Sequence, residues 1–269
     1  NNTAIKETKA QEDELLKGIA PVKEQFTAWK NDSAKLFLEF FQKHPDAKAV
    51  PDNMSMLGSI YLFDLDEANK ASEILRRLAD EYPKEPATQK ALFMLGRAQA
   101  ENGNIAEAAK SFEKLLAKPE EIALANLRYI SDICLQAGLP ESAIKANQEV
   151  LQRAANKNSP DYEQISRAAK ERATFSLGQA QTALKRYRDA IKTLEQLLQD
   201  NEKTAYFLDV KFLLAEARAA MNPPDWEALE KDLYDILMQA SSPALRNRAS
   251  CEYAEALLRS GGAEKRASA

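Results

Sequence analysis

Residues 92–116 read LFMLGRAQAENGNIAEAAKSFEKLL, and this stretch holds a pattern that explains much of the rest of the chain. Apolar residues recur in it at steps of three and four, which is typical of helices, with Gly96 inside the first helical segment. A glycine within a helix costs roughly 0.5 to 1 kcal/mol relative to alanine, so Gly96 needs a structural reason. We expect two antiparallel helices to cross closely here, with Gly96 meeting Ala108. Gly103 then ends the first helix in a left-handed conformation.

The same pattern returns along the chain, and prolines lie at or beside the expected helix ends. The equivalent small-residue pairs are Gly58 with Ala71, Gly96 with Ala108, Ser131 with Ala143, and Gly178 with Ala190. The predicted repeats cover 51–83, 89–119, 124–155, 171–202 and 208–240, after N-terminal helices and a degenerate first repeat in 1–45 and before a capping helix over 243–261. The first copy has one extra residue in its turn, and the linker 154–164 lengthens the third interval.

These copies resemble the tetratricopeptide repeat, a helix-turn-helix unit of about 34 residues. Residues 89–119 match its pattern best, and the resemblance extends over most of the chain. It implies an all-α fold in which one domain, 1–269, forms a right-handed superhelical solenoid. The Lys and Asn with which members of this family clamp the C-terminal carboxylate of chaperone tails are absent, so the resemblance does not imply a chaperone-tail adaptor.

Composition excludes several classes of function. Lys and Arg number 37 against 41 Asp and Glu, so the net charge of −4 favours no nucleic-acid partner. No apolar run reaches the roughly 18 residues that a transmembrane helix requires. The chain begins at Asn1 without a methionine, which is compatible with the loss of a leader or a lipid anchor.

No residue pattern indicates catalysis, a cofactor or a metal. Cys134 and Cys251 have no second Cys or His at the short spacings of metal sites, and we expect both to be buried on helices. His44, the only histidine, precedes Pro45 at an expected helix end, where an imidazole is usually a solvated cap. We therefore predict that the protein is not an enzyme.

The resemblance implies a groove lined by the first helix of each repeat, in which a protein or peptide segment can lie. The inner positions that we assign to partner binding are Ser59, Phe93, Arg97, Arg128, Asp132, Phe175, Gln179, Phe212 and Glu216. The three phenylalanines share one repeat position, and they either anchor a peptide or pack into the core between repeats. We predict a non-catalytic scaffold that binds a protein or peptide.

The N-terminal segment offers an alternative function. Its apolar residues follow alternating steps of four and three, typical of a coiled-coil seam: Leu15, Ile19, Val22, Phe26 and Trp29. Pro21 interrupts this seam, so we favour its packing against a second helix over 33–45, which leaves a monomer. Pairing of two copies would instead make the chain a structural, oligomeric component of the cell envelope that acts through its N-terminal helix.

Two second helices close with Tyr-Pro or His-Pro, in LADEYPKEP (78–86) and FFQKHPDA (40–47). They look like the repeats of bacterial cell-envelope proteins such as the outer-membrane β-barrel assembly lipoprotein and the periplasmic Tol-Pal coordinator. This resemblance implies a scaffold in the periplasm or at the outer membrane. A cytoplasmic location is the alternative, because the motif also occurs in cytoplasmic repeat proteins.

Overall fold

The computed structural model describes residues 2–260, with side chains from residue 20 onward. Every regular element in this part of the chain is a helix, so the all-α class is confirmed. Contacts divide the chain into two units, Asn1–Leu115 and Leu116–Ala269, which are described in turn. Continuity of one solenoid across 1–269 stays a prediction.

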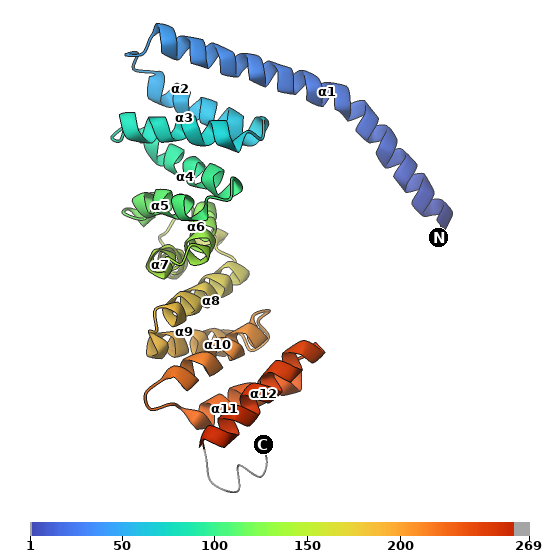
Figure 1. Ribbon diagram of the computed structural model, residues 1–269, viewed down its shortest axis with the longest axis vertical. Coiled ribbons are helices and arrows are strands. Elements are labelled where there is room, and N and C mark those ends of the chain that lie inside the picture. Colours follow the sequence, from blue (N-terminus) through green and yellow to red (C-terminus); the bar gives the residue numbers. More distant parts are fainter. Residues whose placement is uncertain (1, 261–269) are drawn as a thin grey trace. The chain divides into compact units, whose positions relative to one another are not determined.

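Unit 1 consists of a long N-terminal helix and two helical hairpins (Figure 1). Its elements are α1 (Asn2–Lys43), α2 (Val50–Ser59), the π-helical turn η1 (Ile60–Asp64), α3 (Ala68–Glu81), α4 (Pro86–Glu101) and α5 (Ile105–Leu115). Helices α2 and α3 fill the predicted range 51–83, and α4 and α5 fill 89–119. Helix α4 begins at Pro86, where the missing N–H costs no helical hydrogen bond.

The two helices expected within 1–45 are one helix, so the predicted hairpin is wrong. The polar residues around 31–33, where the first expected helix would give way to the second, bond back to the helix itself. Asn31 Nδ2 donates to the Thr27 carbonyl at 3.0 Å, and Ser33 Oγ donates to the Trp29 carbonyl at 2.9 Å. The seam therefore cannot fold onto 33–45, and Val22 and Trp29 are 66% and 61% exposed. Leu15 and Ile19 lie outside the described side chains.

The helical glycines lie at close crossings, but their partners differ from the prediction. They receive large side chains rather than alanines. An added Cβ would lie 2.4 Å from Leu75 at Gly58, 2.4 Å from Phe112 at Gly96, and 2.5 Å from Leu194 at Gly178. The alanines Ala71, Ala108, Ala143 and Ala190 are fully buried on the second helices of their hairpins. In the third hairpin, Ser131 takes the glycine position and its hydroxyl accepts a hydrogen bond from Asn147 at 2.8 Å.

The turns follow the sequence closely. The extra residue of the first copy lies in η1, where the Leu65 N–H donates to the Ile60 carbonyl at 3.0 Å, five residues back. Gly103 and Gly138 have φ of +78° and +72°, which confirms the predicted left-handed ends.

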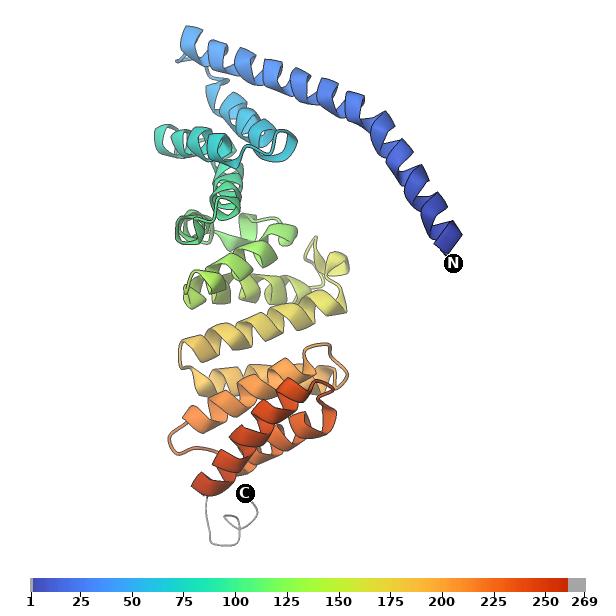
Figure 2. The ribbon, with the colours of Figure 1, turned by 45° about the vertical axis from the view of Figure 1, so that its right-hand side comes forward.

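Unit 2 continues the hairpin pattern, and its helices lie side by side from green to red in Figure 2. Its elements are the 3₁₀ turn η2 (Pro119–Glu121), α6 (Leu124–Gln136), α7 (Pro140–Ala155), the 3₁₀ turn η3 (Tyr162–Gln164), α8 (Arg167–Ala183), α9 (Tyr187–Asp200), α10 (Phe207–Ala220), α11 (Trp226–Gln239) and α12 (Pro243–Ser260). Helices α6, α8 and α10 are the first helices of their hairpins, and α12 follows the last hairpin.

Arg153 holds the long linker between α7 and α8. Its guanidinium pairs with Glu149 at 2.6 Å and Asp161 at 2.8 Å, and it donates to the Pro119 carbonyl at 2.9 Å. The irregular linker thus has a fixed course despite its length.

The two cysteines and the histidine have different surroundings. Cys134 is buried, but Cys251 is exposed, so the expectation of two buried thiols is half wrong. Cys251 lies on α12 and is not among the buried residues of that helix, which are Ala249, Ala256 and Leu257. His44 is exposed and follows the last residue of α1.

Candidate functional site

The first helices of unit 2 form two hollows. The first, called the α6–α8 hollow, has a volume of about 550 Å³ and is walled by α6, α8 and Tyr206, over Asn147 and Val150 of α7. The second, called the α10–α12 hollow, has a volume of about 390 Å³ and is walled by α10 and α12 over residues of α11. Both lie within unit 2, and together they form the candidate binding site.

Three charged side chains surround the α6–α8 hollow. Arg172 Nη2 lies 2.8 Å from Asp132 Oδ2, whereas Arg128 Nε lies 4.0 Å from the same oxygen. Arg128 is also more exposed, with 65% of its side chain accessible against 34% for Arg172. Asp132 therefore binds Arg172 closely and leaves Arg128 open to solvent.

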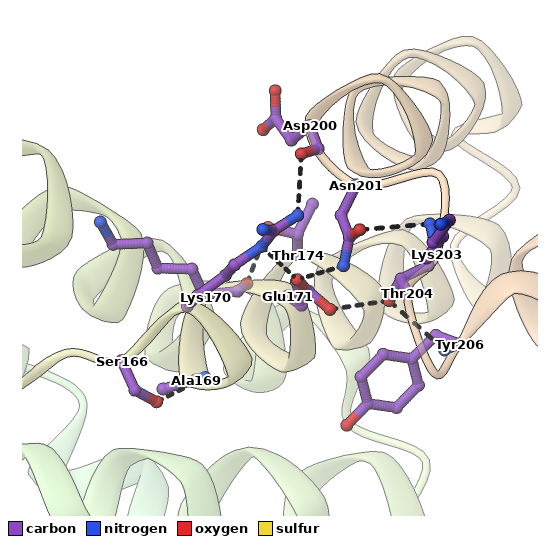
Figure 3. Close-up of polar contacts among 11 residues, drawn as sticks. Ser166, Ala169, Lys170, Glu171, Thr174, Asp200, Asn201, Lys203, Thr204 and Tyr206 are labelled. Carbon is purple, nitrogen blue, oxygen red and sulfur yellow. Dashed lines mark hydrogen bonds and ion pairs between the residues drawn. The ribbon is translucent and has the colours of Figure 1, made fainter.

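Glu171 positions the loop that closes the other side of this hollow (Figure 3). Its carboxylate accepts hydrogen bonds from Asn201 at 2.7 Å, from Thr204 at 2.8 Å, and from Arg167 at 3.0 Å. Burial raises the pKa of Glu171, but these three donors outweigh burial and hold its pKa below the usual value. A charged Glu171 thus ties α8 to the 201–206 loop.

The fixed loop places Tyr206 against α8. Its ring stacks on Phe175 with centroids 4.8 Å apart and an interplanar angle of 17°. Phe175 is half-buried and also packs on the core of α9 and α10. Phe175, which the sequence predicted as a peptide anchor, therefore supports Tyr206 in the wall of the hollow. Part of the Phe175 ring is buried in the core of α9 and α10.

The α10–α12 hollow has an apolar floor and a charged rim. Trp226, Leu229 and Leu233 supply apolar surface, and Phe212 forms part of the wall. The guanidinium of Arg248, from α12, lies 4.3 Å from the centroid of the Phe212 ring. Helix α12 is therefore a wall of the hollow as well as the terminal helix predicted as a cap.

The predicted site residues separate into groups. In unit 2, Arg128 and Asp132 line the α6–α8 hollow, and Phe212 and Glu216 line the α10–α12 hollow. Phe175 packs as described, and Gln179, on the same helix, is half-buried.

The remaining three predicted residues lie in unit 1. Ser59 is half-buried at the end of α2. Phe93 packs on Phe112 with ring centroids 6.0 Å apart, so its ring contributes to the hairpin core. Arg97 lies over the Phe63 ring at 4.8 Å and pairs with Glu101 at 2.8 Å.

Sequence reasoning missed four residues that build the hollows: Arg172, Tyr206, Trp226 and Arg248. Arg172 had a signal, since it precedes Phe175 by three positions on the same helix face. Tyr206 precedes the first residue of α10, Trp226 is the first residue of α11, and Arg248 comes from α12. Repeat register alone does not place these three.

Neither hollow contains a catalytic arrangement that we can identify. Within the described residues, no group of three or more His, Cys, Asp and Glu side chains is placed to hold a metal ion. No helix in that part of the chain has the length and apolar character needed to cross a bilayer. The hollows instead combine small or apolar surface with a few charged groups, a combination suited to binding.

Family comparisons agree with the hairpin structure. One tetratricopeptide-repeat model matches residues 59–122 and 93–160, and a second matches 172–204, so together they span about half of the chain. The chain is a tetratricopeptide-repeat protein. No curated protein sequence matches it significantly. The family models do not confirm the cell-envelope subtype.

Solved tetratricopeptide-repeat structures share the fold. YrrB, described as a protein of this family with an unusual peptide-binding site, is 12% identical with a TM-score of 0.54, over 81% of this chain and 99% of its own. A protein of the family from Parabacteroides merdae is 16% identical with a TM-score of 0.50, over 78% of this chain and 73% of its own. At these identities the likeness shows the fold alone.

Proposed function

We propose that this tetratricopeptide-repeat protein is a non-catalytic scaffold whose unit 2 binds a peptide segment of a partner protein along the first helices. The observation that carries this proposal is the pair of hollows on α6, α8, α10 and α12. A peptide lying across these helices can place side chains in both hollows at once. The described peptide-binding site of YrrB supports this use of the fold.

The chemistry of the hollows also favours binding. Arg128, Trp226 and Arg248 are of the residue types that most often dominate binding energy. Their backbones belong to helices, so little ordering is needed before a peptide binds. The binding surface is therefore pre-organised before the peptide binds.

The test is selection from a random peptide library displayed on phage, with the purified protein immobilised. We expect enriched peptides, and we expect Ala169→Trp or Ala219→Trp to weaken their binding about tenfold or more by filling a hollow. Both alanines are exposed and line a hollow, so an added ring does not enter the core.

Gln148→Trp is the matched control, because Gln148 is exposed on α7, a second helix. It should leave the affinity of the enriched peptides unchanged. Absence of any enriched peptide, or equal loss in all three variants, would contradict the proposal.

A second candidate rests on α1. The exposed residues Val22, Phe26, Trp29 and Leu36 continue the seam on one side of this helix. Residues at this spacing can pair with the same stripe of a second copy. The candidate role is then structural self-association, in contrast to the monomer predicted from the sequence.

We further propose that the protein acts in the bacterial periplasm or at the outer membrane, with the cytoplasm as the alternative. Support comes from the Tyr-Pro and His-Pro helix endings at 82–83 and 44–45. Fractionation of cells that produce the protein at its natural level tests this location. Recovery in the cytoplasmic fraction would exclude it.

A further inference from the structure

Resting on the proposed function, we infer that the bound peptide has a defined charge polarity. It places an acidic side chain over the α6–α8 hollow, and an apolar side chain next to a basic one over the α10–α12 hollow. The inference follows from the opposite net charge of the side chains that line the two hollows.

The α6–α8 hollow carries one positive charge in excess. Arg128 and Arg172 share the single carboxylate of Asp132, and the 2.8 Å contact belongs to Arg172. The exposed Arg128 guanidinium retains donors for an acceptor from outside the protein. A carboxylate is the group that matches those donors in charge and geometry.

The floor beside Arg128 leaves room for such a group. Ala125, Ala169 and Ala173 line the hollow with methyl groups only. A peptide backbone can approach these helices closely, and the acidic side chain then reaches Arg128 at the rim. Larger residues at these positions would hold the peptide away.

The α10–α12 hollow carries the opposite excess. Arg248 pairs with Glu252 at 2.8 Å, and Arg259 pairs with Glu255 at 2.6 Å. Glu216 also lines the hollow, is exposed, and has no ion pair among the described side chains. A Lys or Arg of the peptide would neutralise Glu216, while a neighbouring apolar side chain covers the floor of Trp226 and leucines.

The spacing of the two features follows from the packing of the helices. The hollows are two first-helix intervals apart along unit 2, and these helices lie no closer than directly packed helices, which are about 8 to 10 Å apart. The separation is therefore at least roughly 16 to 20 Å, which an extended peptide crosses in no fewer than about five or six residues. An acidic residue and an apolar-basic pair should be separated by at least that number.

Peptide selection with charge-reversed proteins tests this polarity. From a random 16-residue library on phage, the natural sequence should enrich peptides with the pattern above. Arg128→Glu should weaken their binding about tenfold, and replacement of the acidic peptide residue by Lys should restore it. Glu216→Lys should weaken the same peptides, and replacement of their basic residue by Glu should restore binding.

Both substitutions are on exposed side chains, so folding is not at risk, and circular dichroism checks it. Lys145→Glu is the control of equal charge, because Lys145 is exposed on α7. Enriched peptides without the charge pattern, or peptides that the reversals affect no more than Lys145→Glu does, would overturn this inference and leave the proposed function standing. If no peptide is enriched at all, the proposed function fails first.

Discussion

At residues 58, 96 and 178, the missing side chain on one helix makes space for a large one on the next. Leu75, Phe112 and Leu194 are fully buried where they enter these spaces. Burial of a Leu or Phe side chain contributes about 1.5 to 3 kcal/mol, which exceeds the helix propensity that the glycine loses. The glycine and the large residue form one packing unit.

Gly96→Ala should therefore lower the free energy of unfolding by about 1 to 2 kcal/mol, because overpacking against Phe112 outweighs the gain in helix propensity. Urea denaturation of the purified protein measures this change. Gly96→Ala combined with Phe112→Leu should lose less than the sum of the single losses, since the smaller side chain removes the clash. Additive losses would show that the two positions are independent. The exposed Lys90→Ala serves as the control.

Asp232, on α11, is buried between two cations. Lys211 Nζ lies 2.9 Å from its Oδ1, and Arg218 bonds to its Oδ2. Burial lowers the pKa of Lys211, but Asp235 and Asp232 outweigh burial and keep its pKa above the usual value. The cluster is thus a charged part of the core between α10 and α11.

Asp232→Asn should lower the free energy of unfolding by about 3 kcal/mol, because it leaves buried positive charge without its carboxylate. Lys211 keeps Asp235 and Arg218 keeps Glu195, which limits the loss. Urea denaturation compares this variant with Glu81→Gln, which breaks an exposed pair with Arg77. Equal effects of the two substitutions would show that burial adds nothing to the cluster.

At the scale of helices and loops, Glu171 links α8 to the 201–206 loop. Its lowered pKa means that the carboxylate stabilises the fold above its unfolded pKa, about 4.3, and that this contribution is lost as pH falls through the lower folded value. At pH 7 the natural protein should be more stable than Glu171→Gln by on the order of 1 kcal/mol. Thermal unfolding measured between pH 3 and 7 should show that the stability difference between the natural protein and Glu171→Gln becomes smaller as the pH falls towards 3.

Glu163→Gln provides the control, because Glu163 is exposed in the α7–α8 linker. The thermal stability of Glu163→Gln should equal that of the natural protein at every pH in this range. A Glu171→Gln difference that is constant with pH would contradict the assigned charge.

Helix boundaries in unit 2 were largely predictable from sequence. The predicted repeat 124–155 begins and ends where α6 begins and α7 ends. Prolines and the turn glycine Gly138 account for this, since they restrict the backbone locally. The single helix α1 was not predicted, because Asn31 and Ser33 favour helix ends in isolation and only their bonds to preceding carbonyls show otherwise.

At the scale of the whole molecule, the site was predictable only where repeat register determines it. Repeat register assigns Arg128, Asp132, Phe212 and Glu216 to first helices, and these four residues line the hollows, while their part in binding stays a prediction. The net charge of the α6–α8 hollow depends on Arg172, and that of the α10–α12 hollow depends on side chains of α12. Contacts between separate helices bring these side chains to the hollows. Sequence periodicity carries no information on those contacts.

Self-association through α1 is the alternative at this scale. If it occurs, analytical ultracentrifugation should show a dimer that Val22→Glu with Trp29→Glu converts to a monomer, since both side chains are exposed on one stripe. Lys23→Glu with Gln25→Glu, also exposed on α1, is the control and should leave the dimer intact. A natural protein that stays monomeric up to about 100 µM would exclude this role in favour of the first proposal.

Hydrogen–deuterium exchange of the protein with and without a selected peptide tests the central claim most directly. The account predicts slower exchange in α6, α8, α10 and α12, where the two hollows lie, with little change in α9. Protection confined to α9, or to α1, would place the binding surface elsewhere and contradict it.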